Sequence, residues 1–159
     1  MHASPNANTL LSCLLIEKVL CEGELDLLDT LMAPDAVVHE LEDLSPSAAR
    51  GTKGFREFIQ VFRSAFPDLR VKVVDQLADG DRVATRWRME GTQSGRLMGI
   101  EASHRPVSVD GIRIDRIAQG RIAETWNQWD TIGMLRQLGA LPALDRQPAA
   151  ASTSIAFAA

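Results

Sequence analysis

The sequence predicts a single α+β domain, with helices packed on one face of a curved, mainly antiparallel sheet. Apolar residues recur at helical spacing through about the first 66 residues, and from Leu69 onward they alternate with polar residues, as in β-strands. The 159 residues, 45% of them hydrophobic, suffice for one core and are too few for two ordinary domains. We therefore expect one domain over residues 1–141 and a disordered, Ala-rich tail over residues 142–159.

Three amphipathic helices are expected in the first part of the chain. They span about residues 8–21, 24–32 and 52–66, with Thr52 as the N-cap of the third. Each span is followed by a residue that ends a helix: Gly23, Pro34 and Pro67. The third helix presents an aromatic face that includes Phe62. These apolar faces must be buried against the sheet.

A short strand and a loop lie between the second and third helices. Residues 36–39 are apolar enough for a brief strand, which ends at His39. The segment 40–50 contains three acidic residues and the sequence Ser45-Pro46-Ser47, as is typical of an exposed loop. Such a loop could lie over the opening of a pocket.

Two hairpins and a short helix complete the predicted fold. Residues 71–77 pair with residues 83–90 across a turn at Gly80, and residues 107–118 pair with residues 120–130. Along the strand of residues 107–118, Arg113 shares a face with Asp115 and Ile117, and Ile112, Ile114 and Arg116 occupy the other face. On the last strand Ala123, Thr125, Asn127 and Trp129 alternate with Ile122, Glu124, Trp126, Gln128 and Asp130. Because each face carries a tryptophan, we expect this strand to be covered on both sides.

Charge and composition exclude several classes of partner. The net charge is −4, with 17 basic and 21 acidic residues mixed along the chain, so nucleic acid and anionic membranes are not expected partners. The longest apolar run, residues 10–16, is far too short to span a membrane, and residues 1–5 lack the basic segment of a secretion signal. We expect a cytoplasmic protein in which Cys13 and Cys21 are reduced structural thiols.

No metal or cofactor site is predicted. His2, His39 and His104 are scattered, no Cys/His spacing suits zinc, and no glycine-rich loop suits a phosphate. The expected cofactor is none.

An ordered set of short motifs between about Asn8 and Gly139 resembles the SnoaL-like polyketide cyclase (ester cyclase) family. The set comprises Ala65-Phe66-Pro67-Asp68-Leu69, Gly80-Asp81-Arg82-Val83-Ala84, Gly91-Thr92, Gly99-Ile100, Arg116-Ile117, Gly120-Arg121-Ile122, Trp126, Asp130 and Leu135-Arg136-Gln137-Leu138-Gly139. The resemblance implies a cystatin-like cone of the nuclear transport factor 2-like superfamily, with a pocket inside the curved sheet. It also implies a homodimer formed through the convex face of the sheet.

The resemblance further implies a class of chemistry. The family includes cofactor-independent cyclases that close a polyketide ring by intramolecular aldol chemistry, and relatives on the same cone hydrolyse epoxides, hydroxylate, isomerise or only bind. In the cyclases an inward aspartate just after the position of Trp126 is the acid/base, and here that position is Asn127. A carboxamide cannot titrate, so Asn127 can orient a substrate or donate to an oxyanion but cannot be the general base.

Arg113 and His39 are the other candidate catalytic residues. Arg113 matches an inward polar position of the family and would stabilise an enolate or bind a carboxylate or phenolate; alternatively it is a surface arginine paired with an acid such as Asp115. His39 lies where such cones open and could shuttle a proton, or it is simply solvated. Asp130 is an N-cap unless a bulge turns it inward, and His104 is a weaker candidate.

Substrate-binding candidates come from the inner faces of the strands and the third helix: Thr85, Trp87, Thr125, Trp129 and Phe62. A tryptophan there would stack on a flat aromatic substrate, although packing in the core accounts for it equally well. One of Trp126 and Trp129 should line the cavity, and the other should meet a subunit partner or an outer cover.

Two functions are therefore carried forward. The first is a cofactor-free, polyketide cyclase-type enzyme of secondary metabolism that acts on a small, oxygenated, polyketide-like substrate. The second is a non-catalytic module that binds a small molecule on the same cone, which the replacement of the family aspartate by Asn127 favours; a hydrolase, hydroxylase or isomerase on this fold is a further alternative. A homodimer is the expected assembly.

Overall fold

The computed structural model describes residues 5–41 and 49–142. Its sheet has five strands: β1 (Met32–Val38), β2 (Arg70–Asp79), β3 (Arg82–Thr92), β4 (Pro106–Ala118) and β5 (Arg121–Trp129). The spatial order is β1-β5-β4-β3-β2; β1 is parallel to β5, and the other neighbouring strands are antiparallel. The predicted α+β class, with its two hairpins, is therefore confirmed. The expected tail begins at the last described residue, Pro142, and otherwise lies outside the described residues, as does the middle of the expected loop.

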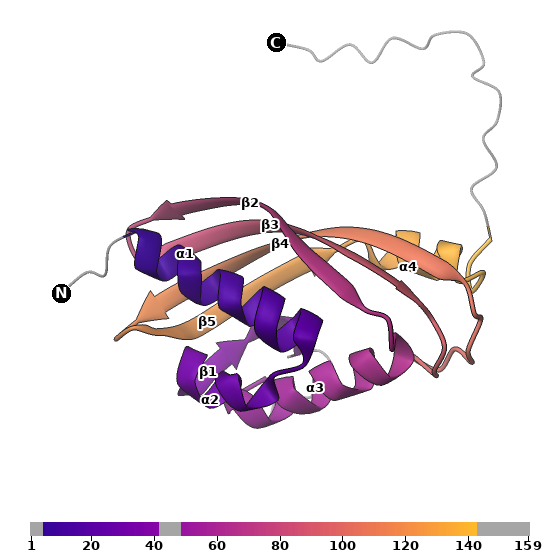
Figure 1. The fold of residues 1–159 in the computed structure, drawn as a ribbon, viewed down its shortest axis with the longest axis horizontal. Helices are drawn as coiled ribbons and strands as arrows, with labels where there is room; N and C mark the ends of the chain where they lie inside the picture. Colours follow the sequence, from indigo (N-terminus) through magenta and orange to yellow (C-terminus); the bar gives the residue numbers. More distant parts are fainter. Residues whose placement is uncertain (1–4, 42–48, 143–159) are drawn as a thin grey trace, which may run out of the picture.

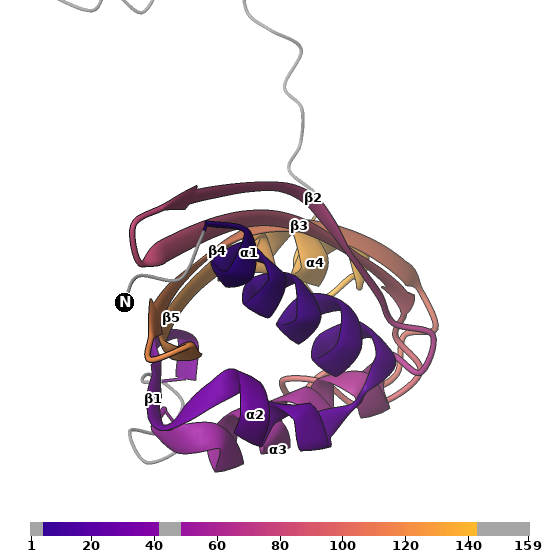
Figure 2. The same cartoon turned by 60° about the vertical axis from the view of Figure 1, so that its left-hand side comes forward.

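The helical segments are α1 (Pro5–Leu14), the π-helix η1 (Leu15–Glu22), the 3₁₀ turns η2 (Leu25–Leu27) and η3 (His39–Leu41), and the helices α2 (Leu28–Leu31), α3 (Gly51–Ala65) and α4 (Thr131–Gln137). Figures 1 and 2 show the sheet arching over α1, α2 and α3, which lie on its concave side. The convex side carries no helix in these views. The buried side chains fall into two clusters, one around Phe55 and Ile122 and the other around Phe66 and Trp87.

The first two predicted helices differ from the observed ones. The first continues as a π-helix from Leu15, and the second has only four α-helical residues because Met32 already pairs with Ile122 as the start of β1. Thr52 is not an N-cap: α3 begins at Gly51, and the Thr52 hydroxyl donates to the Asp29 carboxylate at 2.7 Å. Tertiary contacts therefore override the helix signals of the sequence at the end of the second helix and at the start of the third.

A β-bulge in β5 sets which side chains face the pocket. Arg116 pairs with Glu124, but Ile117 pairs with Ile122, so β5 has an extra residue at Ala123. The strict alternation predicted Ile122 on the same face as Glu124; instead Ile122 is fully buried in the core. Beyond the bulge the predicted alternation holds, with Thr125 buried and Asn127 and Trp129 lining the pocket described below.

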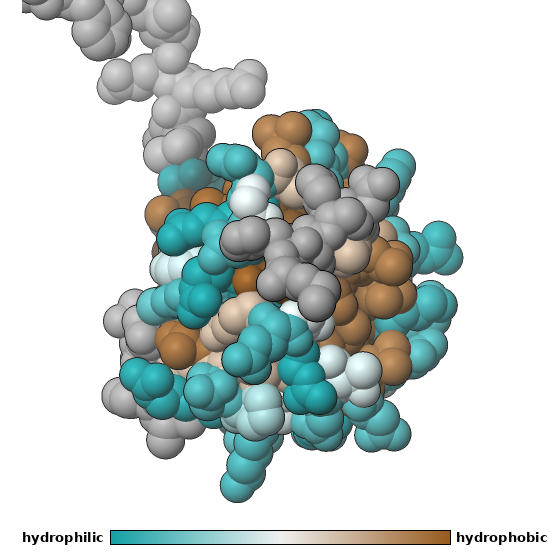
Figure 3. Space-filling view, turned by 90° about the vertical axis from the view of Figure 1, so that its left-hand side faces the viewer, coloured by the Kyte–Doolittle hydropathy of each residue, from teal (hydrophilic) through white to brown (hydrophobic). Residues whose placement is uncertain are grey.

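The surface of the described residues mixes polar and apolar groups. Figure 3 shows hydrophilic side chains interspersed with hydrophobic patches at the end of the molecule where α1 begins. None of the described helices is long and apolar enough to cross a membrane.

Leu28→Ala should lower the free energy of unfolding by about 2–5 kcal/mol, because it removes a fully buried side chain from the first core cluster. Leu10 is 57% exposed on α1, so Leu10→Ala is the matched control and should change stability by less than about 0.5 kcal/mol. Urea denaturation followed by circular dichroism measures both. Equal losses in the two variants would contradict the placement of the core.

Candidate active site

A partly open pocket lies between the concave face of the sheet and the helices α3 and η1. Its volume is about 60 Å³. Aliphatic side chains such as Ile59 and Val71 form part of its wall. Aromatic rings form much of the rest, and they belong to Phe55, Phe58, Phe62, Trp87 and Trp129. The cavity is smaller than the roughly 300–1,000 Å³ of common ligand sites. Its side chains must therefore rearrange to admit more than a few water molecules.

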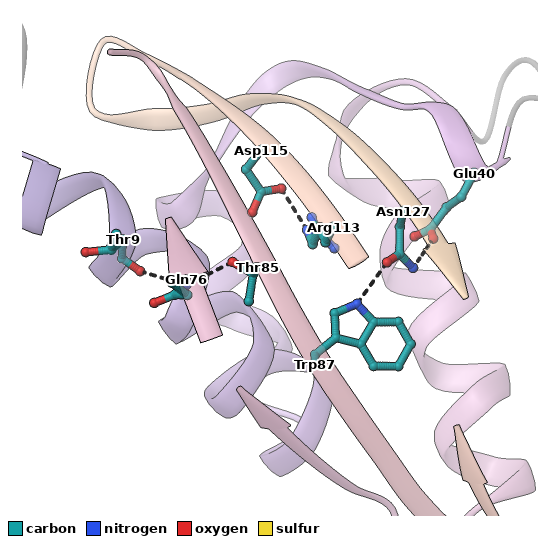
Figure 4. A network of polar contacts seen from close by, with 8 residues as sticks. All are labelled: Thr9, Glu40, Gln76, Thr85, Trp87, Arg113, Asp115 and Asn127. Carbon is teal, nitrogen blue, oxygen red and sulfur yellow. Dashed lines mark hydrogen bonds and ion pairs between the residues drawn. The ribbon is translucent and has the colours of Figure 1, made fainter. Parts of the chain in front are cut away.

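Polar side chains cross the inner face of the sheet in a single row. The register pairs Gln76 of β2 with Thr85 of β3, Thr85 with Arg113 of β4, and Arg113 with Asn127 of β5. The amide of Gln76 donates to the Thr85 hydroxyl at 2.9 Å, as Figure 4 shows. Directly opposed residues of neighbouring strands share one face. The fold therefore places the sequence-predicted pair Arg113 and Asn127 side by side.

Arg113 is a buried cation whose partner lies on its own strand. Its Nε donates to Oδ1 of Asp115 at 2.7 Å, and the two side chains are 2% and 0% exposed. The alternative that paired this arginine with an acid was right about Asp115, but the pair is buried rather than at the surface. Nη2 of Arg113 has no hydrogen-bond partner among the described residues. An N–H group of the guanidinium is thus unpaired beside the pocket that Arg113 lines.

Asn127 is held between two side chains. The indole Nε1 of Trp87 donates to its Oδ1 at 3.0 Å, and its Nδ2 donates to Oε2 of Glu40 at 2.6 Å (Figure 4). An indole N–H can only donate, so the amide oxygen must face Trp87 and the amide nitrogen must face Glu40. The two hydrogen bonds fix the carboxamide in one orientation.

Glu40 is the functional candidate that the sequence analysis missed. It was assigned to an exposed loop, but it lies in η3 directly after β1 and lines the pocket. Burial raises the pKa of its carboxyl above the ordinary value, and Asp115 adds to this rise, while the positive charge of Arg113 and the hydrogen bond from Asn127 oppose it. Strand alternation does not extend to it: β1 ends at Val38, and residues 39–41 form the 3₁₀ turn η3 that brings Glu40 to the pocket.

His39 lies on the other side of the sheet from the pocket. Its Nε2 is 2.9 Å from Oε1 of Glu124, and its ring stacks on Trp126 with the centroids 4.8 Å apart. Arg116 also donates to Glu124, at 2.8 Å, and these two neighbours lower the pKa of the Glu124 carboxyl. The structure therefore does not bring His39 to Arg113 and Asn127, because the 3₁₀ turn that begins at His39 directs the side chains of His39 and Glu40 to different faces of the sheet.

The remaining candidates fall into three groups. Phe62, Trp87 and Trp129 line the pocket, so Trp129 rather than Trp126 is the inward tryptophan of β5. Thr85 and Thr125 are fully buried on the same inner face without lining the pocket. Asp130 caps α4, accepting from the backbone N–H of Gly133 at 2.7 Å, and His104 is exposed in the loop before β4.

The site combines a carboxylic acid, a carboxamide and a guanidinium inside an aromatic wall. These groups can take up a proton, orient a carbonyl and stabilise a developing oxyanion. Among the described residues, no group of His, Cys, Asp and Glu side chains is arranged to hold a metal ion.

Gly111→Ala should disrupt the Trp87–Asn127 contact, because the added methyl group would overlap the indole ring of Trp87, which crosses directly over this glycine. We expect a loss of about 1–3 kcal/mol in stability. We also expect a shift of one of the three indole N–H resonances in a proton–nitrogen NMR spectrum. Ser108→Ala, at an exposed position on the same strand, is the control. Unmoved indole resonances in Gly111→Ala would contradict the close approach.

Comparisons with known proteins agree with this architecture. The family model of the SnoaL-like polyketide cyclases matches residues 13–138. No curated protein matches the sequence. TsrD from Streptomyces laurentii is 31% identical, with a TM-score of 0.78 over 87% of this chain and 99% of its own. IdmH from Streptomyces antibioticus, a candidate polyketide cyclase, is 30% identical, with a TM-score of 0.68 over 83% and 98%.

A third solved structure has the same fold. AclR from Streptomyces galilaeus, a candidate hydroxylase, is 24% identical, with a TM-score of 0.74 over 90% of this chain and 87% of its own. At that identity the likeness extends to the fold alone. The family match and the two relatives above 25% identity go further, and this chain belongs to the SnoaL-like polyketide cyclase family.

Proposed function

We propose that this protein is a cofactor-independent enzyme of secondary metabolism. It binds a small, flat, oxygenated, polyketide-like substrate and promotes an intramolecular aldol-type ring closure or a related proton transfer. The observation that carries the proposal is the buried Arg113, whose Nη2 has no partner among the described residues and which lines an aromatic pocket. An oxygen that gains negative charge during the reaction would be stabilised there.

The chemistry needs three things from the site. A base must remove a proton from a carbon beside a carbonyl, a cation or hydrogen-bond donor must stabilise the resulting enolate, and the chain must be folded so that the enolate carbon reaches a second carbonyl. Arg113 supplies the cation that stabilises the enolate. The aromatic walls of the pocket hold the substrate in the folded shape by stacking on its flat rings. Phe62 and Trp129 already meet edge to face, with centroids 6.0 Å apart.

The competing function is a non-catalytic module that binds the same class of molecule. The replacement of the implied family aspartate by Asn127 favours it, because a carboxamide cannot abstract a proton. The two functions share the pocket and differ in turnover alone.

We also propose that a second copy of the chain covers the convex face of the sheet. Ile112 and Ile114 are 55% and 36% exposed on the outer face of β4, beside Trp126 of β5. Apolar side chains in the middle of a sheet face favour a symmetric contact with an identical face. We place the protein in the cytoplasm, where its two free cysteines, Cys13 and Cys21, would stay reduced.

A suitable model substrate is 1-(2-acetylphenyl)propan-2-one, whose aldol closure and loss of water give a fluorescent methylnaphthol. The wild-type protein should accelerate formation of this product. Asn127→Ala should slow product formation by an amount equal to about 2–4 kcal/mol of transition-state stabilisation, because the oriented carboxamide is lost from the site. A protein that binds 2-naphthoate but never forms product would favour the non-catalytic module.

Arg113→Lys should weaken the binding of 2-naphthoate by about 1.5–3 kcal/mol, because lysine keeps the charge beside Asp115 but loses the second N–H edge. Isothermal calorimetry measures the change. The control is Arg82→Lys: the guanidinium of Arg82 lies 5.4 Å from the Trp126 ring on the convex face, so affinity should not change. Equal affinities in the wild type and Arg113→Lys would remove Arg113 from the binding site.

Sedimentation equilibrium should give twice the 17.4 kDa mass of one chain at micromolar concentration. Ile112→Lys should shift the equilibrium towards monomer, because it places a charge in the centre of the proposed contact. Leu10→Lys is the control: Leu10 is 57% exposed on α1, which lies on the concave side of the sheet, and the substitution should leave the dimer intact. A wild-type mass of one chain would refute the dimer.

A further inference from the structure

The pocket contains one carboxyl group that is not neutralised by an ion pair. Among the described residues that line the cavity, Glu40 is the one acid. Asp115 is also on the inner face, but its Oδ1 accepts from Nε of Arg113 at 2.7 Å, so it serves as the counter-ion of the guanidinium. The carboxyl of Glu40 instead receives a neutral donor, Nδ2 of Asn127, at 2.6 Å.

This contact gives a physical reason for an amide at position 127. An aspartate there would place a second carboxylate within hydrogen-bond distance of Glu40, and two such groups cannot both ionise without strong repulsion. The amide instead donates to Glu40 and is itself oriented by Trp87 (Figure 4). The exchange of a carboxylate for an amide on β5 therefore fits the presence of a carboxylate at the end of β1.

We propose that Glu40 is the general base, and then the general acid, of the ring-closing reaction, and that Asn127 is the positioning residue that aims it. The inference rests on the proposed function. It assigns the proton transfer to the carboxyl end of β1, whereas the family resemblance implies a carboxylate on the last strand.

The reaction balances without a further reagent. Ionised Glu40 takes a proton from the carbon beside a substrate carbonyl, and the electrons of the broken C–H bond form an enolate whose oxygen faces Arg113. The enolate carbon then bonds to a second carbonyl carbon, whose oxygen becomes an alkoxide. Protonated Glu40 returns its proton to that oxygen, so the residue ends as it began.

The surroundings of Glu40 favour the protonated form of its carboxyl more than water does. Burial raises the pKa of its carboxyl, with a smaller rise from Asp115, and these effects act against Arg113 and Asn127. Arg63 of α3 is the other charged group that lines the pocket. Since only the ionised form is a base, the rate should rise with pH through a pKa above the ordinary glutamate value.

The decisive experiment follows proton abstraction alone. The exchange of the α-protons of 2-tetralone for deuterium in heavy water is monitored by NMR for the wild type, Glu40→Gln and Glu40→Asp. We expect Glu40→Gln to slow the enzyme-dependent exchange by at least about 100-fold and to abolish its pH dependence, and Glu40→Asp to restore part of the rate. Affinity for 2-naphthoate should stay within about threefold, because Arg113 and the aromatic wall are unchanged.

Glu124→Gln is the matched control. Glu124 is a glutamate of β5 that is bound to His39 and Arg116 on the opposite face, so this variant should exchange protons at the wild-type rate. A folded Glu40→Gln variant that exchanges within about threefold of the wild type would overturn the role of Glu40 and leave the proposed function standing. Absence of exchange in the wild type, with 2-naphthoate still bound, would overturn both.

A second variant keeps the inference testable if Glu40→Gln does not fold. Asn127→Asp places a carboxyl against Glu40, so the pH profile of exchange should move to higher pH and show two ionisations in place of one. A profile identical to that of the wild type would show that Glu40 and position 127 do not act together, and would overturn the proposal.

Discussion

The buried ion pair between Arg113 and Asp115 is the constraint on which the site depends. Bringing a guanidinium out of water costs several kcal/mol unless a counter-ion and hydrogen-bond acceptors replace the solvent. On β4 the counter-ion is two residues away on the same face, so the strand carries both charges into the interior together. The inner face of β4 can then present a cation to the pocket while the remaining wall stays apolar.

Asn127 links this charged centre to the other elements. Its two hydrogen bonds connect β5 to Trp87 of β3 and to Glu40 at the end of β1, so three separate parts of the chain meet at one carboxamide. Because β1 runs parallel to β5, the end of β1 lies beside the inward residues of β5. Trp87 reaches Asn127 only because Gly111, its neighbour on β4, has no side chain in the way.

Periodicity was sufficient to predict the two hairpins and which residues of each strand share a face, and the family resemblance indicated that Arg113 and Asn127 point inward. Both residues lie in regular stretches of strand, where alternation decides the face. It failed where the backbone departs from regularity. The bulge at Ala123 reversed the expected face of Ile122, and the 3₁₀ turn η3 that follows β1 brought Glu40 inward and left His39 outside. The π-helix from Leu15 has the same apolar spacing as an α-helix over so short a length, and the pattern could not separate them.

The bulge at Ala123 also determines which residues of β5 face inward. On its C-terminal side the odd-numbered residues face the pocket, and on its N-terminal side an even-numbered residue, Ile122, faces the core. A single residue gained or lost there would exchange the two sets and bring Trp126 and Gln128 inward without altering any of them. The functional groups that β5 presents to the pocket therefore depend on the number of residues at the bulge as much as on their identity. A relative with one residue more or fewer there would present different side chains from a similar sequence.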